Sequence, residues 1–223
     1  MQRKLQRKLT SELAQFWDSF RAREKLSVCD WALKYRYLAK GVTSKPGKYS
    51  LDAGPYQREP QEAFTDRDVM TVVMMWASRT GKTETLNNLD GYIIHHDPKA
   101  ILKVYPTLDS ATKWRKEFFN PLISATPVLR GRINIKARNS DNTMLALRFP
   151  GGNISSIGTN SPSGFRQIQA PVVECDEIDA MEDGKEGDPI TLAFKRADNY
   201  PDSIQVLSST PTIKGHSRIE SWM

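Results

Sequence analysis

Short apolar runs alternate with segments of helical pattern over most of the chain. Runs of four to eight residues, rich in Val, Ile and Leu, have the length and composition of buried strands at residues 69–76, 101–105, 172–175 and 204–207. Segments of helical pattern predict helices over residues 82–95, 108–119 and 189–197. Because strands alternate with helices, we predict an α/β fold with three layers around a mostly parallel sheet.

Less regular segments flank and interrupt this pattern. Residues 133–135, 144–149 and 153–157 are predicted to form short antiparallel strands, joined by polar turns at 139–142 and 151–152. Pro121 and Pro127 are expected to interrupt the chain after the helix at 108–119.

The part of the chain before residue 69 has a different pattern. A helix is predicted over residues 12–20, after the capping pair Thr10 and Ser11, and a second helix over residues 27–39. Several Gly and Pro residues then predict a loop over residues 40–60. We therefore expect an N-terminal helical region, residues 1–45, and one further domain, residues 50–223.

A phosphate-binding loop is predicted where the strand at 69–76 passes into the helix at 82–95. Residues 76–83 read Trp-Ala-Ser-Arg-Thr-Gly-Lys-Thr. Such a loop needs backbone N–H groups around the phosphates, a Lys that reaches the β- and γ-phosphates, and a hydroxyl for Mg²⁺. Gly81, Lys82 and Thr83 fill these places, whereas Trp76 stands where the usual pattern has its first Gly. Because Gly-Lys-Thr also occurs by chance, the octapeptide alone does not decide the function.

Two adjacent carboxylates, Asp176 and Glu177, follow the predicted strand at 172–175. Ligands of parallel sheets bind outside the carboxyl ends of the strands. One carboxylate there can serve Mg²⁺ and the other can polarise an attacking water. The alternative is a solvated acidic loop, because acids are frequent from Glu174 to Asp183. Val172 and Val173, which are β-branched and precede the acids, favour a buried strand end at Asp176.

Composition suits a soluble globular protein with a polyanionic partner. The 223 residues include 32 basic and 26 acidic ones, a formal charge of +6. Basic residues gather at 3–25 and 130–148, where a solvated helix or hairpin face is the alternative to nucleic-acid contact. Cys29 and Cys175 give neither a disulfide framework nor zinc spacing, which favours a reducing cytoplasm. No apolar stretch is long enough for a membrane span, and no His is placed for a covalent hydrolytic triad.

Seven short segments between residue 55 and the end of the chain form a linked pattern. They are PYQREP at 55–60, RTGKTE at 79–84, VYPT at 104–107, GFR at 164–166, ECDEID at 174–179, GDPI at 187–190 and SSTPT at 208–212. Their order and spacing resemble the ATPase half of the large terminase subunits of tailed bacteriophages, in particular the GpA-type group. The resemblance implies a P-loop NTPase fold of the ASCE/RecA-like type. It also implies an ATP-driven motor that packages double-stranded viral DNA into a procapsid.

The resemblance further implies roles for individual residues, with ATP and Mg²⁺ as cofactors. Lys82 and Thr83 match the phosphate and Mg²⁺ contacts. Asp176 matches the second Mg²⁺ group, and Glu177 the catalytic base. Two arginines are implied as catalytic: Arg79 within the phosphate loop, and Arg166 as a residue that reaches a neighbouring subunit's site. The implied nucleotide contacts are Tyr56, Gln57, Ser78, Arg79, Thr80, Gly81, Lys82, Thr83, Glu84, Ser209 and Thr210.

Simpler interpretations stay open for three of these assignments. Tyr56 could pack as an ordinary loop residue. The segment from Ser208 to Thr210, which matches the coupling motif, could be a turn before Pro211. Arg166 could be a surface arginine paired with an acid.

The implied partners are double-stranded DNA and further copies of the chain, in a ring on a portal or procapsid in the host cytoplasm, with no membrane. The N-terminal region could contact the small terminase subunit. Nothing after Ser209 supplies the acidic cluster of a terminase nuclease, so we expect a truncated ATPase domain that does not cut DNA.

Two other classes of function remain as alternatives. A helicase-like translocase also has a phosphate loop, an Asp-Glu strand end and a coupling motif, but it requires a second RecA-like domain. A non-catalytic module would bind nucleotide only as a structural ligand.

Overall fold

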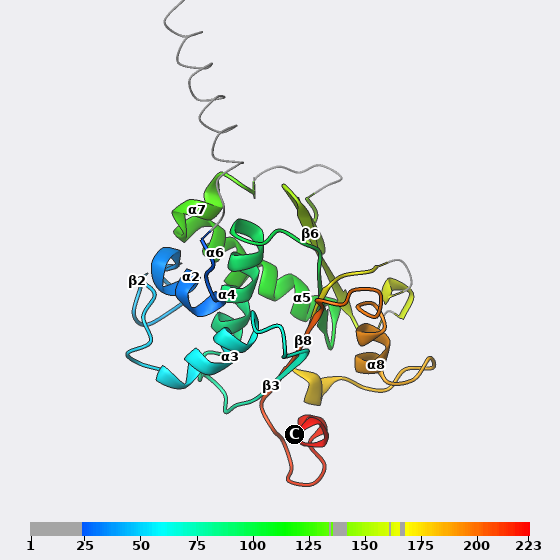
Figure 1. The fold of residues 1–223 in the computed structure, drawn as a ribbon. Helices are drawn as coiled ribbons and strands as arrows, with labels where there is room; N and C mark the ends of the chain where they lie inside the picture. Colours follow the sequence, from blue (N-terminus) through cyan, green and yellow to red (C-terminus); the bar gives the residue numbers. More distant parts are fainter. Residues whose placement is uncertain (1–23, 134, 136–141, 161, 166–167) are drawn as a thin grey trace, which may run out of the picture.

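A sheet of six strands forms the centre of the molecule (Figure 1). The computed structural model describes residues 24–133, 135, 142–160, 162–165 and 168–223. The strands are β3 (Thr71–Met75), β4 (Ile101–Tyr105), β5 (Ala146–Phe149), β6 (Gly152–Gly158), β7 (Val172–Asp176) and β8 (Ile204–Ser209). They lie in the order β3-β8-β7-β4-β6-β5, with β5 antiparallel to β6 and the other pairings parallel. The predicted mostly parallel sheet and the antiparallel pair are confirmed.

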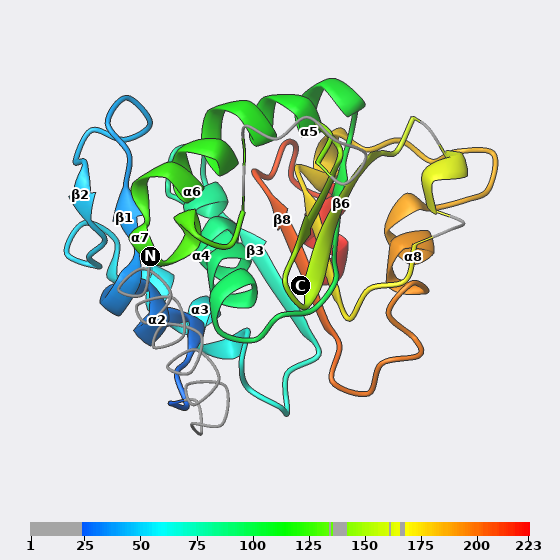
Figure 2. The same ribbon diagram turned by 90° about the horizontal axis from the view of Figure 1, so that it is seen from above.

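Helices cover both faces of the sheet and make three layers (Figure 2). The α-helices are α2 (Val28–Tyr35), α3 (Arg58–Ala63), α4 (Lys82–His95), α5 (Leu108–Trp114), α6 (Asn120–Ala125), α7 (Pro127–Arg130) and α8 (Pro189–Phe194). Shorter turns are the 3-10 helices η1 (Pro55–Gln57), η3 (Pro162–Phe165), η4 (Ile178–Ala180) and η5 (Arg218–Trp222), and the π-helix η2 (Arg115–Phe119). Helices α2, α4 and α6 lie on one side of the sheet and α8 on the other.

Each face of the sheet has its own apolar core. Trp31 of α2 and Ile93 of α4 are buried in the first cluster, and Ile190 of α8 is buried in the second. Val206 and Leu207, neighbours on β8, belong to opposite clusters, as the period of two along a strand requires. Because each buried side chain of this kind contributes roughly 1.5–3 kcal/mol, the two cores hold the strand ends in fixed relative positions.

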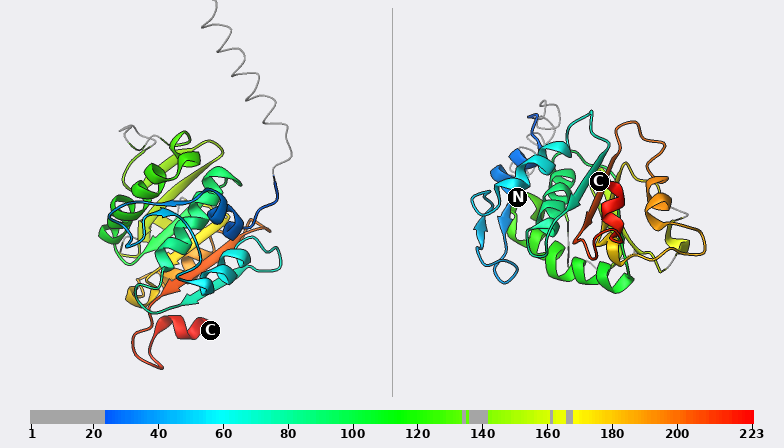
Figure 3. Two further views of the ribbon diagram at one scale, coloured as in Figure 1. Left: turned by 90° about the vertical axis from the view of Figure 1, so that its left-hand side faces the viewer. Right: turned by 90° about the horizontal axis from the view of Figure 1, so that it is seen from below.

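The register of the parallel strands brings three segments to one edge of the sheet. Met75 pairs with Ser209 across β3 and β8, and Asp176 pairs with Ser208 across β7 and β8. The phosphate loop, the carboxylate pair and the Ser-Ser-Thr segment therefore leave the sheet side by side. The 3-10 helix η5 contacts β3 and η4 at this edge (Figure 3).

Before the sheet, the described elements depart from the prediction. The helix predicted over 27–39 is α2, and it ends at Tyr35. Its expected last turn instead forms β1 (Tyr37–Leu38), which pairs with β2 (Gly47–Lys48) in a small antiparallel sheet. The segment predicted as loop, 40–60, contains β2, η1 and the start of α3. The helix predicted over 12–20 lies outside the described residues.

Later elements agree more closely. The predicted helix 82–95 and strand 101–105 coincide with α4 and β4. Ile133 and Ile135 lie outside any strand, so the strand predicted there is wrong. Pro121 lies where η2 passes directly into α6, so it does not interrupt the helical run. The run does end before Pro127, because Thr126 is extended and Pro127 begins α7.

Candidate functional site

The loop between β3 and α4 has a backbone suited to an anion. Gly81 has a φ of 95°, in the left-handed region, and directly precedes α4. The backbone angle favours glycine, and a Cβ at this position would lie 2.4 Å from Nε2 of Gln57, so the end of that side chain would have to move. No side chain caps the first turn of this 14-residue helix. Its backbone N–H groups are therefore available to a ligand, and the helix dipole favours negative charge there.

The ammonium group of Lys82 joins the loop to the end of β8. Its Nζ donates to the carbonyl oxygens of Trp76 and Ala77, both at 3.0 Å, and to Oγ1 of Thr210 at 2.7 Å. Burial lowers the pKa of this amine, and the negative charges of Asp176 and Glu177 oppose that change. Lys82 thus lies within electrostatic range of two carboxylates that are remote from it along the chain.

These two carboxylates have different surroundings. Asp176, at the end of β7, is 7% exposed, whereas Glu177 is exposed to solvent. Oδ1 of Asp176 accepts the backbone N–H of Glu177 at 3.0 Å. Burial raises the pKa of Asp176 because it disfavours the charged carboxylate. A cation bound next to Asp176 would act in the opposite direction and favour the ionised form. Glu177 has a φ of 57°, a conformation that is rare for residues with a side chain and that occurs often in active sites.

Asp179 ties the loop after β7 to the chain that follows β8. Its backbone N–H donates to Oγ of Ser209 at 3.1 Å. Its carboxylate accepts hydrogen bonds from the N–H and hydroxyl of Thr212, the hydroxyl of Ser217 and the N–H of Ile219. Burial acts to raise the pKa of this carboxyl, but the hydrogen bonds outweigh it and lower the pKa.

Tyr56 and Gln57 hold the phosphate loop from its other side. The carbonyl oxygen of Thr80 accepts from the Tyr56 hydroxyl at 2.8 Å and from Nε2 of Gln57 at 3.1 Å. The Tyr56 ring packs edge-on against Trp76, with ring centroids 5.2 Å apart. Trp76, which replaces the usual loop glycine, therefore serves as a packing surface for η1.

A chain of buried polar groups extends from Gln57 into the helical layer. Oε1 of Gln57 accepts from Tyr49, whose hydroxyl accepts from Gln61 in turn. Gln61 accepts from Asn88 of α4, and Asn88 accepts from Nε of Arg36. The guanidinium of Arg36, 2% exposed, also forms an ion pair of 2.7 Å with Glu84 in the first turn of α4. These contacts hold the phosphate loop through Gln57 and the first turns of α4 through Asn88 and Glu84.

A family comparison decides which group of proteins has this arrangement. The model of the phage terminase large subunit gpA, ATPase domain, matches residues 43–223. The chain belongs to this family. This terminase ATPase domain is similar to the large terminase subunit of Enterobacteria phage P21, with 30% identity over 201 residues. That alignment covers 87% of the chain and 31% of the relative, so the chain spans less than a third of that protein.

Solved structures show the same fold for other terminases. The crystal structure of the HK97 bacteriophage large terminase has a TM-score of 0.68 and 12% identity, and the match covers 88% of the chain and 40% of that protein. The large terminase ATPase domain of Thermus phage P74-26 has a TM-score of 0.50 and 16% identity, with 70% and 64% covered. The α/β sheet of this chain is therefore that of terminase ATPase domains.

The donor atoms of the terminase site suit a magnesium nucleotide. Thr83 and Asp176 offer a hydroxyl and a carboxylate, the oxygen ligands that Mg²⁺ prefers. The buried hydroxyl of Ser208, in register with Asp176, interacts with that carboxyl and lowers its pKa, against the effect of burial. Within the described residues, no group of three His, Cys, Asp or Glu side chains could hold a metal alone. Since Mg²⁺ is usually held by one or two protein ligands together with phosphates, this set fits it.

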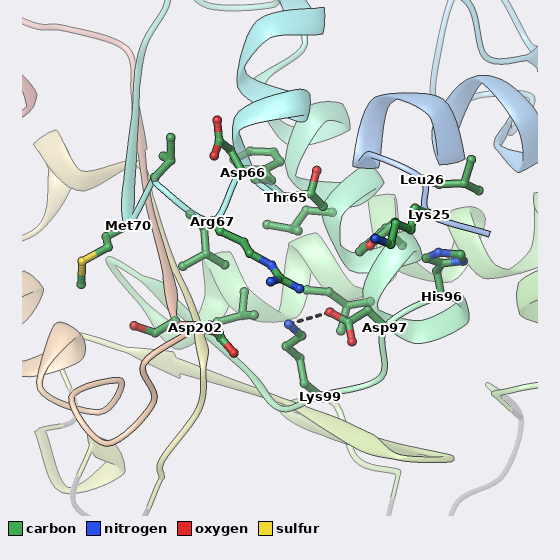
Figure 4. Close-up of a pocket in the computed structure, with 18 of the residues that line it drawn as sticks. Lys25, Leu26, Thr65, Asp66, Arg67, Met70, His96, Asp97, Lys99 and Asp202 are labelled. Carbon is green, nitrogen blue, oxygen red and sulfur yellow. Dashed lines mark ion pairs between the residues drawn. The ribbon is translucent and has the colours of Figure 1, made fainter. Parts of the chain in front are cut away.

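A separate cleft lies at the opposite end of the strands. It has a volume of about 690 Å³ and includes residues that begin or precede β3, β7 and β8, among them Met70, Val172 and Ile204. Figure 4 shows Arg67 projecting into it and the ion pair between Lys99 and Asp97. Because the phosphate loop leaves the other edge of the sheet, this cleft is distinct from the candidate site.

Most of the predicted site residues gather at one edge of the sheet. Ser78 and Arg79 lie exposed in the loop, and Arg79 has a φ of 63°. Arg166 lies outside the described residues. Asp179, Arg36 and the buried polar chain were missed, since isolated polar residues in separate segments carry no periodic signal. No helix in the described part of the terminase domain is long and apolar enough to cross a membrane.

Proposed function

We propose that this chain binds and hydrolyses ATP with Mg²⁺ at the loop between β3 and α4. The main support is the position of Lys82, whose ammonium group donates hydrogen bonds to the loop and to Thr210. The charges of Asp176 and Glu177 also act on this group. Phosphate loop, acidic strand end and Ser-Ser-Thr segment then surround one triphosphate. Membership of a family described as an ATPase domain supports this proposal.

In this proposal the chain positions the nucleotide by backbone and side chain. The N–H groups around Gly81 and the start of α4 bind the phosphates, and Lys82 exchanges its backbone partners for the β- and γ-phosphates. Thr83 and Asp176 would hold Mg²⁺, which would neutralise negative charge on the phosphates. Tyr56 and Gln57 contact the nucleotide next to the loop that they hold. Ser78, Thr80, Glu84 and Ser209 complete the contacts.

Glu177 acts as the general base. Its exposed carboxylate takes a proton from a water that attacks the γ-phosphorus in line, while the bond to the β-phosphate oxygen breaks. Arg79 stabilises the charge that develops on the γ-phosphate, and Arg166 does so from a neighbouring subunit. No covalent enzyme intermediate is required.

We propose that the protein uses this reaction to move double-stranded DNA into a procapsid in the host cytoplasm. The segment from Ser208 to Thr210 would sense loss of the γ-phosphate through Lys82 and Asp179. Copies of the chain would form a ring on the portal, with the small terminase subunit as a further partner. We propose residues 50–223 as the ATPase domain and residues 1–45 as an N-terminal helical region, whose helix α2 packs against α4 in the same core.

A phosphate-release assay with and without linear duplex DNA tests the proposal. We expect hydrolysis that DNA stimulates, that no strand separation accompanies, and that Lys82→Ala abolishes. Unwinding of the duplex would instead indicate a helicase. Nucleotide binding without turnover, in a ring-forming full-length protein, would indicate a non-catalytic module.

A further inference from the structure

A buried cluster of three charged residues joins the phosphate-loop helix to the strand of the acidic pair. Nζ of Lys103, on β4, lies 2.8 Å from Oδ2 of Asp90 on α4 and 2.6 Å from Oε2 of Glu174 on β7. The three side chains are at most 1% exposed. Lys103 also lies over the ring of Trp114, 4.5 Å from its centroid. It is thus enclosed by a helix, a neighbouring strand and an aromatic ring.

The two acids occupy particular positions relative to the proposed metal ligands. Glu174 and Asp176 are two residues apart on β7, so their side chains lie on the same face of the sheet. Asp90 follows Thr83 by seven residues, close to two helical turns, so both lie on the same face of α4. The pair Asp90 and Glu174 therefore repeats, farther from the strand ends, the relation between Thr83 and Asp176. Lys103 is the bridge of this inner pair.

Such a cluster is a poor way to gain stability alone. Burial raises the pKa of both carboxyls, and a buried ionic cluster is often no more stable than a well-packed apolar replacement. The carboxyls of Asp90 and Glu174 also interact with each other through a side-chain hydrogen bond, which acts to lower the pKa of Asp90 and to raise that of Glu174. The cluster does fix the distance between α4 and β7, because Lys103 pairs in register with Glu174 of β7 and binds Asp90 of α4 at the same time.

We propose that Lys103 is a positioning residue, which with Asp90 and Glu174 fixes α4 against β7 so that Thr83 and Asp176 can hold one Mg²⁺ together. This inference rests on the proposed nucleotide site. It adds the groups that set the distance between the proposed Mg²⁺ ligands, Thr83 and Asp176. Side chains that orient metal ligands typically contribute 10–100-fold to metal affinity or activity.

The test compares variants of the full chain in ATP binding, with and without Mg²⁺. Lys103→Met removes the bridge. Glu174→Leu removes the contacts of β7 with Lys103 and Asp90 and keeps the Lys103–Asp90 pair, whereas Glu174→Gln keeps an oxygen that can accept from Lys103. Arg115→Met is the matched control: Arg115 is another buried cation, 5% exposed, and within the described residues its side chain contacts Asn142 and Phe119 rather than β7.

We expect Lys103→Met and Glu174→Leu to reduce the gain in ATP affinity that Mg²⁺ provides by about tenfold. Metal-free affinity should stay within about twofold of the parent, while Glu174→Gln and Arg115→Met keep the gain. If Lys103→Met does not fold, the two Glu174 variants decide. If Mg²⁺ increased the ATP affinity of the parent, Glu174→Leu and Glu174→Gln equally, this inference would be overturned and the proposed function would stand. A parent without Mg²⁺-dependent ATP binding would overturn the proposed function as well.

Discussion

The hydroxyl of Thr210 lies 2.7 Å from the ammonium nitrogen of Lys82. This hydrogen bond connects the phosphate loop with the end of β8, two segments that are far apart in sequence. Because Lys82 also binds two loop carbonyls, its position depends on both segments at once. A change at the end of β8 would therefore alter the position of the Lys82 ammonium group at the site proposed for the γ-phosphate.

Thr210→Val removes the hydroxyl and keeps the shape of the side chain. A hydrogen bond to a charged group contributes roughly 1.5–3 kcal/mol, and Lys82 is partly exposed, so we expect the lower end, about a tenfold loss of kcat/KM. Steady-state ATP hydrolysis measures it. Thr71→Val, at the opposite end of β3, is the control and should keep the parent rate. Equal rates for both variants would remove Thr210 from the coupling path.

Gln57→Leu should weaken ATP binding more than Tyr56→Phe does. Gln57 donates to the Thr80 carbonyl and also accepts from Tyr49, so its loss leaves polar groups unpaired at two places. The Tyr56 hydroxyl makes one such bond, and the residue is 49% exposed. We expect about a tenfold weaker Kd for Gln57→Leu and about twofold for Tyr56→Phe. A titration with a fluorescent nucleotide distinguishes them, and the reverse order would be evidence against the clamp on Thr80.

Arg36→Met should destabilise the fold strongly. The guanidinium of Arg36 is buried against Glu84, and loss of one partner of a buried pair costs about 3–5 kcal/mol. Lys34→Ala, which breaks the exposed pair between Lys34 and Glu24, should leave the stability close to that of the parent. Urea unfolding gives both values. Similar midpoints for the two variants would show that the Arg36 contact contributes little.

Asp179 gives the stability of this edge a defined pH dependence. Its pKa is lowered in the folded state, so its contribution is present above the unfolded pKa, about 3.9, and is lost as the pH falls through the folded value. Asp179→Asn should therefore reduce stability at neutral pH, and its difference from the parent should shrink below about pH 4. Urea midpoints over a pH series measure this, with exposed Asp68→Asn as the control. A difference that is the same at every pH would contradict the assignment.

The sheet edge could be predicted from the sequence because its causes are local. Gly81 and the apolar run before it define where β3 ends and α4 begins, and parallel strands then bring Asp176 to the same edge. The acidic run shows the limit of composition. Glu174 and Asp176 are buried, whereas Glu182 and Asp183 are exposed, so the alternative of a solvated loop holds for only part of the run.

The remaining features depend on contacts between distant segments. Lys103 reads as one polar residue in an apolar strand, and only the packing of α4 and β7 gives it partners. Likewise, the polar chain from Gln57 to Arg36 combines residues from five separate elements and loops. No spacing rule along the chain connects them.

A structure of the chain with Mg²⁺ and a non-hydrolysable ATP analogue tests the central claim most directly. We predict one nucleotide at the start of α4, with Nζ of Lys82 at its β- and γ-phosphates. A metal ion should lie between Thr83 and Asp176, and the Glu177 carboxylate should face the γ-phosphate. A nucleotide bound elsewhere, or one that contacts Lys82 while Asp176 and Glu177 face away from it, would contradict the account.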